Sequence, residues 1–447
     1  MKRVKAMKRS VLMTLLAGIC AVSICGCGQD AGGQELEAQK GETQEQEMEE
    51  AGNGSEKTEL VYYTWADEEG YISKVVDAFN AQSETTHVTA TYIPSSGTDY
   101  DEKIVSMLSS QSEMDLFSAS NVKSLVRYID AECLADMTEA IENSDLDMAK
   151  YGTSFLSTGK EGKFYGLPYR YSTMALFFNK HIFDQEGIPY PSQMSWEEYA
   201  ELAKELTKER EDGTMQWGGF LPDWLGEPIL TVQRGSNVMD EDTSALKEWL
   251  GLLERLYITD KSHMSFEEMR STSTDWLKIF LAGDVAMLPN GEWTIGNAMQ
   301  EISNNADVLG DFEMGVTFMP LPEGINEPVT VGGPNTFIMI NQNSEKFDSA
   351  FEFASFLCGP EGAPYLIEGG MIPAYLDEET IQLYKDTVGV DGVEDMLAAD
   401  TLYESSTDSD FSQVDTIWRE EKELCLIGEQ TLDESIENFE KRRAEVK

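Results

Sequence analysis

Residues 60–65, LVYYTW, are the first segment that predicts the fold. They form an apolar, aromatic-rich run of strand length, and a helical pattern follows at residues 71–79. A second strand is predicted at residues 88–93, a second helix at 100–108 and a third strand at 115–117. Strands that alternate with helices in this way predict an α/β fold with a mainly parallel sheet.

The folded region is longer than one ordinary core requires. About 390 residues follow the N-terminal part, which favours two domains. Later in the chain, Ser195 and Glu198 have the spacing of a capping box, and Trp196 and Tyr199 follow at helical spacing as expected core residues.

The N-terminal segment has the composition of a secretion signal. Its first nine residues contain five Lys or Arg side chains and no acid, and an apolar run follows at residues 11–24. This run of about 14 residues is shorter than the roughly 20 that cross a hydrocarbon core. Cleavage is therefore favoured over a permanent transmembrane helix.

A cysteine-containing segment ends this run, with the sequence ICGC at residues 24–27. It resembles the bacterial lipobox, in which a small residue precedes the modified cysteine, and Cys27 follows Gly26. The resemblance implies a signal peptide at residues 1–26 and a lipid on Cys27 that anchors the chain to the outer face of the bacterial cell membrane. Residues 27–57 are rich in Gln, Glu and Gly, which predicts a disordered acidic tether.

The composition argues against several partners and sites. The net charge is −49, so the surface is expected to repel nucleic acid and anionic lipid. Beyond the signal, Cys133, Cys358 and Cys425 are odd in number and widely spaced. This pattern indicates core thiols and not a disulfide framework.

Enzyme motifs are missing from the sequence. The three histidines have no zinc-ligand spacing, and we find no Walker loop, dinucleotide fingerprint or Gly-x-Ser-x-Gly elbow. Acidic turns at residues 240–242 and 408–410 lack the ligand order of a calcium loop. We therefore expect a protein without catalytic residues, metal or cofactor.

Aromatic, glycine and small polar residues collect where strands end or begin. In open α/β sheets, ligands bind in the crevice beyond the carboxyl ends of the strands. Tryptophan and tyrosine faces can pack on the C–H groups of a sugar ring, while planar polar side chains bond its hydroxyls. The segments concerned contain Trp65 with Asp67, Tyr169 with Arg170, Trp224, Asn290 with Trp293, and GGPN at residues 332–335.

Three blocks of sequence stand in a specific order. The first comprises GKFYGLPY at 162–169, LFFNK at 176–180 and WEE at 196–198; the second comprises FLAGDVAM at 280–287 and GEW at 291–293; the third comprises GG at 332–333 and residues 341–344 and 350–360. Together they resemble family 1 extracellular solute-binding proteins, the receptors of carbohydrate ABC importers, of which maltose-binding protein is a distant relative.

This resemblance implies a type II periplasmic-binding-protein-like fold whose two lobes close about a hinge. Lobe 1 would comprise residues 58–168 and 325–378, and lobe 2 residues 169–324 and 379–447. A monomer would pass a small-molecule ligand, a mono- or oligosaccharide, to the permease subunits of an ABC transporter. The implied ligand-binding residues are Trp65, Asp67, Ser96, Ser120, Tyr169, Arg170, Trp224, Asn290, Glu292, Trp293, Gly332 and Gly333, and Trp418 is a weaker candidate.

Two alternatives remain open at this level. The same fold could bind a cationic solute such as a polyamine or peptide, because the chain is acidic and Glu292 lies beside Trp293. A lipid-anchored glycoside hydrolase of the cell surface would share the anchor and tether, although the missing motifs disfavour it.

Overall fold

The computed structural model describes residues 57–94, 99–110, 112–151, 159, 162–222, 229–403, 406, 408 and 410–446. Cys27, the expected signal and the tether up to residue 56 lie outside these described residues. The predicted strands and helices between residues 60 and 117 are confirmed, each a few residues longer at one or both ends or shifted slightly. The strands are β1 (Thr58–Trp65), β2 (Thr86–Ile93), β3 (Leu116–Ala119), β4 (Leu167–Asn179), β5 (Lys208–Glu209), β6 (Met215–Gly219), β7 (Val285–Gly291), β8 (Met314–Thr317), β9 (Val329–Ile340) and β10 (Asp400–Leu402).

These strands form one mixed sheet in the order β2-β1-β3-β9-β4-β7-β6-β5, with β10 beside β9 and β8 beside β4. The α/β class is confirmed, but the expected predominance of parallel strands needs correction. Parallel pairing joins β1 to β2 and β3, β6 to β7, and β10 to β9. The long strands β4 and β9 instead pair antiparallel with each other. Strand β4 is also antiparallel to β7, and β9 is also antiparallel to β3, because the chain runs in opposite directions along the two strands of each pair.

Two hydrophobic clusters lie along this sheet. The first cluster contains buried residues from β1 to the start of β4, from the end of β9 and from α13. The second cluster contains buried residues from the rest of β4, from β7, from α6 and α8, and from the C-terminal helices. Strands β4 and β9 contribute to both clusters, so the backbone passes from one to the other along these strands.

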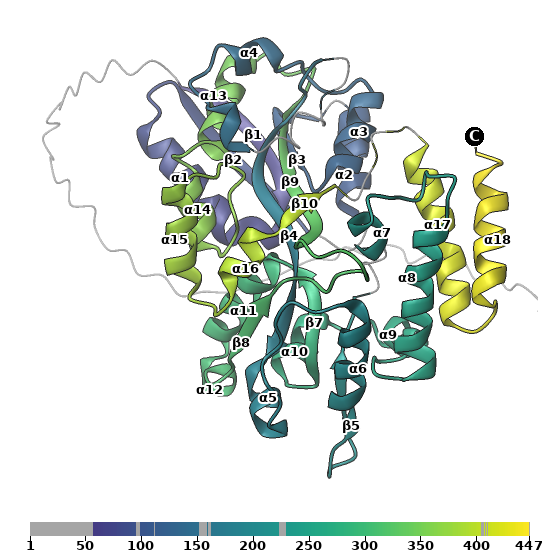
Figure 1. Cartoon of the computed structure of the whole chain (residues 1–447). Helices are drawn as coiled ribbons and strands as arrows, with labels where there is room; N and C mark the ends of the chain where they lie inside the picture. Colours follow the sequence, from purple (N-terminus) through teal and green to yellow (C-terminus); the bar gives the residue numbers. More distant parts are fainter. Residues whose placement is uncertain are drawn as a thin grey trace, which may run out of the picture. The chain divides into compact units, whose positions relative to one another are not determined.

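Helices pack against the sheet, and several of them also pack against one another. Figure 1 shows α17 and α18 beside α8, α1 beside α14, and α14 beside α15, in agreement with their contacts. The helices are α1 (Glu69–Gln82), α2 (Asp99–Ser109), α3 (Val122–Asp130), α4 (Thr138–Glu142), α5 (Lys180–Glu186), α6 (Trp196–Leu206), α7 (Ile229–Gln233), α8 (Ser244–Glu254), α9 (Phe266–Thr272), α10 (Trp276–Leu281), α11 (Trp293–Asn304), α12 (Ala306–Leu309), α13 (Phe347–Cys358), α14 (Ala363–Glu368), α15 (Glu378–Val388), α16 (Val393–Ala398), α17 (Phe411–Leu426) and α18 (Leu432–Arg443).

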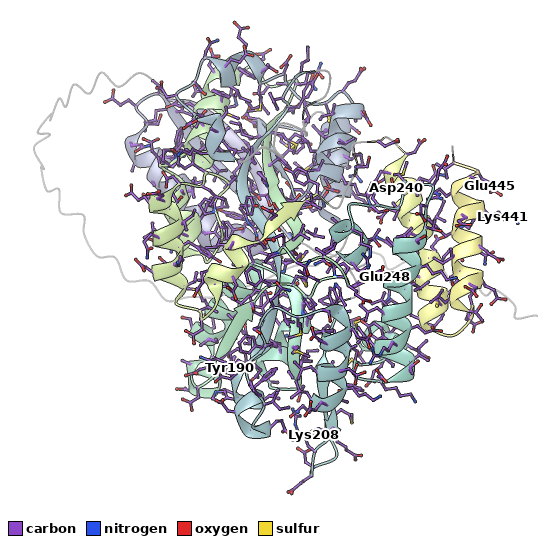
Figure 2. All side chains as sticks on the ribbon, in the orientation of Figure 1. Tyr190, Lys208, Asp240, Glu248, Lys441 and Glu445 are labelled. Carbon is purple, nitrogen blue, oxygen red and sulfur yellow. The ribbon has the colours of Figure 1, made fainter. Side chains whose placement is uncertain are left out.

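Helix α6 begins as its sequence predicts. The Ser195 hydroxyl accepts the Glu198 amide, and the Glu198 carboxylate accepts the Ser195 amide, so the capping box is complete. Trp196 and Tyr199 are buried in the second cluster, which confirms them as core residues. Charged side chains are exposed at Glu248 on α8, at Lys441 on α18, at Glu445 just after α18 and at Lys208 on β5 (Figure 2).

The cysteines beyond the N-terminal segment are free. Cys358 and Cys425 are buried, and Cys133 is half-buried. Burial raises the pKa of the Cys358 thiol well above its usual value, so it stays protonated in the core. The expectation of thiols without a disulfide framework is confirmed for these three residues.

Candidate functional site

A cavity of about 600 Å³ lies where residues from both clusters meet. Its walls come from the loops after β1 and β3, from the middle of β4 and β9, and from helices α10, α11 and α17. A volume of this size is within the range of small-molecule sites. The lining residues are Trp65, Asp67, Glu68, Tyr71, Ser120, Asn121, Arg170, Ser172, Met174, Trp276, Glu292, Trp293, Asn297, Val331, Gly332, Asn335, Thr336, Met371, Tyr403 and Arg419.

Three tryptophans present aromatic surface to this cavity, and all three are half-buried. Trp65 ends β1 and packs against Tyr100, with 4.4 Å between the ring centroids. Trp293 begins α11 and packs against both clusters. Trp276 begins α10 and packs against the second cluster. A ring that packs on the protein on one side and faces a cavity on the other can stack on a flat ligand.

Gly291 explains the position of the Trp293 ring. A Cβ atom on Gly291 would lie 2.1 Å from the Trp293 ring, so the ring packs directly over the glycine backbone. Gly332 allows a second close approach, because a Cβ there would lie 2.2 Å from the Ser172 carbonyl oxygen on the neighbouring strand. The glycines of these motifs therefore place the tryptophan and bring β9 close to β4.

A buried charge network, comprising Arg170, Glu68 and Glu292, forms part of the cavity wall. The Arg170 guanidinium donates from Nη1 to Glu68 Oε1 at 3.1 Å and from Nη2 to Glu292 Oε1 at 3.0 Å. Glu68 lies in the 3-10 turn after β1, while Glu292 lies between β7 and α11. Arg170 on β4 therefore joins a carboxylate beside the first cluster to one beside the second.

Neutral donors complete the bonding of both carboxylates. Glu68 accepts hydroxyl groups from Thr64 at 2.6 Å, Tyr71 at 2.7 Å and Tyr169 at 2.7 Å. Glu292 accepts the Ser172 hydroxyl at 3.1 Å and the Thr173 amide at 3.3 Å. Such complete bonding is what buried charges require, and it fixes the geometry of the wall.

The pKa values in this network shift because of burial. Burial raises the pKa of Glu292, although Arg170 and the two donors partly lower it again. For Arg170, burial would lower the pKa, but Tyr71, Glu292 and Glu68 raise it well above its usual value. The guanidinium therefore stays charged at every pH at which the protein is folded.

The structure brings seven of the residues implied by the resemblance to the cavity: Trp65, Asp67, Ser120, Arg170, Glu292, Trp293 and Gly332. Tyr169 and Asn290 are fully buried and are not among its lining residues, and neither is Gly333. Ser96 and Trp224 lie outside the described residues. Trp418 is fully buried and packs edge-on against Phe439, 5.5 Å away between centroids.

Tyr169 has a different position from the one the sequence suggested. Its ring belongs to the first cluster and its hydroxyl supports Glu68, so it acts through another side chain. Asn290 is the more unusual residue, because neither of its side-chain polar atoms has a hydrogen-bond partner among the described residues. Most buried polar side chains are hydrogen-bonded, so Asn290 is an exception among the described residues.

Several lining residues were not predicted. Glu68 and Ser172 are adjacent or close to predicted residues, and their roles in holding Arg170 and Glu292 depend on contacts across the sheet. Trp276, Tyr403 and Arg419 come from segments without a recognised motif. Asn121 and Asn335 stand in segments that the sequence did single out: Asn121 directly follows Ser120, and Asn335 is two residues after Gly333.

No group of three or more His, Cys, Asp or Glu side chains in the described part of the chain could hold a metal ion. Over the same residues, no helix has the length and apolar character needed to cross a membrane.

Known proteins with similar sequences or structures bind solutes. The arabinooligosaccharide-binding protein of Halalkalibacterium halodurans is 24% identical over 201 residues, 43% of each chain, so the match spans less than half of that relative. The melibiose/raffinose/stachyose-binding protein MelE of Bacillus subtilis is 21% identical over 338 residues, 72% of this chain and 75% of MelE. The ABC substrate-binding protein Lmo0181 from Listeria monocytogenes, solved in complex with cycloalternan, superposes with a TM-score of 0.75 and 23% identity over 87% of this chain and 99% of that chain.

The fold is thus that of periplasmic binding proteins, as the sequence implied. The model of one protein family, the bacterial extracellular solute-binding proteins, matches residues 74–390. Membership of a family of binding proteins agrees with the expectation that this chain is not an enzyme. Because the match covers most of its length, the chain belongs to the family of bacterial extracellular solute-binding proteins.

Proposed function

We propose that this protein captures a sugar in the cavity between two lobes and delivers it to the permease of an ABC importer. The observation that carries the proposal is the pairing of half-buried tryptophans with planar polar groups around one cavity. Trp65, Trp276 and Trp293 offer faces for the C–H groups of pyranose or furanose rings. Arg170, Asn297 and Asn335 can donate hydrogen bonds to hydroxyl groups.

The size and charge of the cavity support an uncharged ligand. At about 600 Å³ the cavity is larger than a single hexose ring needs, which favours a short oligosaccharide. The carboxylates of Glu68 and Glu292 are already bonded to Arg170, so part of their charge is compensated within the wall. Oligosaccharide ligands in the names of two relatives and in one solved complex point in the same direction.

The lobe boundaries are part of the proposal. We place lobe 1 at residues 58–168 and 325–378 and lobe 2 at residues 169–324 and 379–447. The pairing of β4 with β9 shifts register between Pro168 and Arg170 and again between Arg170 and Tyr171, where the chain passes from one cluster to the other. Irregular pairing at a crossing point is a natural place for a hinge.

The lipid anchor on Cys27 completes the proposed function. A tether at residues 27–57 would let the folded part reach a permease while the lipid stays in the membrane. Growth of the host bacterium with a labelled fatty acid should label the wild-type protein, whereas Cys27→Ala should be unlabelled. Label on the Cys27→Ala protein would contradict the assignment.

Calorimetry tests the capture of a sugar. A protein that starts at residue 58 should give saturable binding of micromolar order with at least one neutral oligosaccharide in a panel. Trp293→Ala should weaken that binding about 30-fold, equivalent to about 2 kcal/mol, because it removes a stacking face. Tyr190→Ala, which alters an exposed ring away from the cavity, is the matched control and should bind as the wild type does (Figure 2). Absence of heat for every sugar would contradict the proposal.

A cationic solute is the second candidate, since Asp67, Glu68 and Glu292 outnumber Arg170 and Arg419 in the cavity wall. Salt separates the two candidates. Binding of a polyamine should weaken as the salt concentration rises from low to moderate, whereas binding of a neutral sugar should change little.

A further inference from the structure

The cavity has an ion-pair network on one side, between helices of the two lobes. The Lys123 ammonium on α3 lies 2.8 Å from Asp415 Oδ2 on α17. Helix α3 packs in the first cluster through Leu125 and Tyr128, and α17 packs in the second cluster through Val414 and Trp418. The Lys123–Asp415 pair therefore crosses from one cluster to the other at a distance from the strands that connect them.

Asp415 also bonds to a residue of the cavity wall. The same oxygen, Oδ2, accepts Arg419 Nε at 3.1 Å, four residues further along α17. Arg419 lines the cavity, and so do Ser120 and Asn121, which directly precede α3. The Asp415 carboxylate thus contacts Arg419, a cavity residue on α17. It also contacts Lys123 on α3, the helix that directly follows the cavity residues Ser120 and Asn121.

Burial makes this carboxylate dependent on its partners. The Asp415 side chain is 2% exposed, while those of Lys123 and Arg419 are about one-third exposed. A buried carboxylate needs a positive partner to offset its lost hydration. If α3 moved away from α17, Asp415 would keep Arg419 but lose Lys123, so the pair favours the arrangement in which the two walls are close.

We propose that Asp415 is a positioning residue for ligand capture, which holds Arg419 in the cavity wall and joins α17 of lobe 2 to α3 of lobe 1 through Lys123. The part that concerns ligand rests on the proposed function. The part that concerns the two helices does not, because it can be measured without ligand.

The ligand-free test uses small-angle X-ray scattering on residues 58–447. Lys123→Met and Asp415→Asn should both give a larger radius of gyration than the wild type at low salt, because the walls separate more often. Lys123→Arg keeps the ion pair and should match the wild type. High salt should move the wild type toward Lys123→Met, because the pair is partly exposed and is screened.

A matched control removes a lysine ion pair within one lobe. Lys247 on α8 pairs with Asp433 on α18 at 2.5 Å, and both helices pack in the second cluster. Lys247→Met should leave the radius of gyration unchanged. If Lys123→Met and Asp415→Asn scatter as Lys247→Met does, the link between the helices is overturned.

The ligand test uses stopped-flow tryptophan fluorescence with a sugar that binds the wild type. Lys123→Met should speed dissociation about tenfold, equivalent to about 1.4 kcal/mol, with little change in association. Asp415→Asn should speed it further, because Arg419 also loses its partner. Equal dissociation rates in Lys123→Met, Asp415→Asn and Lys247→Met would overturn the positioning role. If no sugar binds the wild type, the proposed function fails, and the scattering result still decides the link.

Discussion

Two arginines in this protein each hold several carboxylates, but in different surroundings. Arg170 binds Glu68 and Glu292, whose side chains are 5% and 0% exposed. Arg255, at the end of α8, binds Glu197 and Glu201 of α6, whose side chains are 74% and 63% exposed, and also Asp260, whose side chain is 6% exposed and is shared with Lys204. Both networks have short contacts, so the distances alone do not distinguish them.

The difference between the networks lies in hydration. Glu197 and Glu201 keep most of their water, so their pairing with Arg255 exchanges one favourable contact for another. Glu68 and Glu292 have lost their water and depend on Arg170 and on hydroxyl donors. The carboxylates at the cavity wall are thus all buried and depend on Arg170, whereas two of the three carboxylates around Arg255 lie at the surface.

The largest expected effect is that of removing Arg170. Arg170→Met leaves two buried carboxylates without a charged partner, which should lower the free energy of unfolding by about 3–5 kcal/mol. Denaturant titration at neutral pH measures this loss. Adding Glu292→Gln to Arg170→Met should recover part of it, and a double variant no more stable than the single one would contradict this account.

His263 extends the comparison to a buried titratable group that has no charged partner in the described part of the chain. His263 is buried, bonded to Tyr199 and Ser262, and burial lowers its pKa to about 3. The unfolded chain binds a proton near pH 6.5, so the stabilising contribution is complete above that pH and is lost as the pH falls toward 3. Between pH 8 and pH 5 the loss should be about 2 kcal/mol. Denaturant titrations at both pH values measure this loss. The drop in the free energy of unfolding from pH 8 to pH 5 should be about 2 kcal/mol smaller in His263→Gln than in the wild type.

Glu292 should show the opposite dependence on pH, and a smaller one than His263 because Arg170 offsets part of its burial. Its pKa is raised by burial in the folded protein, so its contribution is complete below about pH 4.5 and is lost as the pH rises through the raised value. The free energy of unfolding of the wild type minus that of Glu292→Gln should therefore be smaller at pH 8 than at pH 4.5. A difference that grows with pH would mean that Arg170 outweighs burial.

The smallest expected effect is that of removing Arg255. Arg255→Met should lower the free energy of unfolding by about 1 kcal/mol or less, since Glu197 and Glu201 return to water and the buried Asp260 keeps its ion pair with Lys204. The same denaturant titration compares it with Arg170→Met. Equal losses in the two variants would break the comparison and would mean that burial does not separate the networks.

Much of the fold could be predicted from local sequence. Strand β1, helix α1 and the capping box of α6 follow from side-chain periodicity and from one Ser–Glu spacing, which act over a few residues. The direction of β4 and β9 was not predictable in this way. Pairing between residues 167–173 and 332–338 joins segments far apart in the chain, and nothing within either segment specifies its partner.

The residues of the candidate site also comprise some that local sequence predicted and some that it did not. Trp65, Arg170, Glu292 and Trp293 stand in recognisable motifs next to strand ends, and the cavity includes all four. Tyr169 stands in the same kind of motif, yet its ring is buried, because the side chains of neighbouring strand residues point to opposite faces. Trp276 and Arg419 reach the cavity from helices without a motif.

By itself, the sequence determined the α/β class and the groups of residues that could meet a ligand, and it predicts a secretion signal with Cys27, which stays a prediction. These depend on composition and on short spacings, which are properties of the chain alone. The tertiary structure alone decided that Arg170 joins Glu68 to Glu292, that Tyr169 supports Glu68, and that Lys123 meets Asp415. Each of these contacts joins residues about 100 or more positions apart, so it exists only once the sheet and helices have packed, and burial then sets its strength.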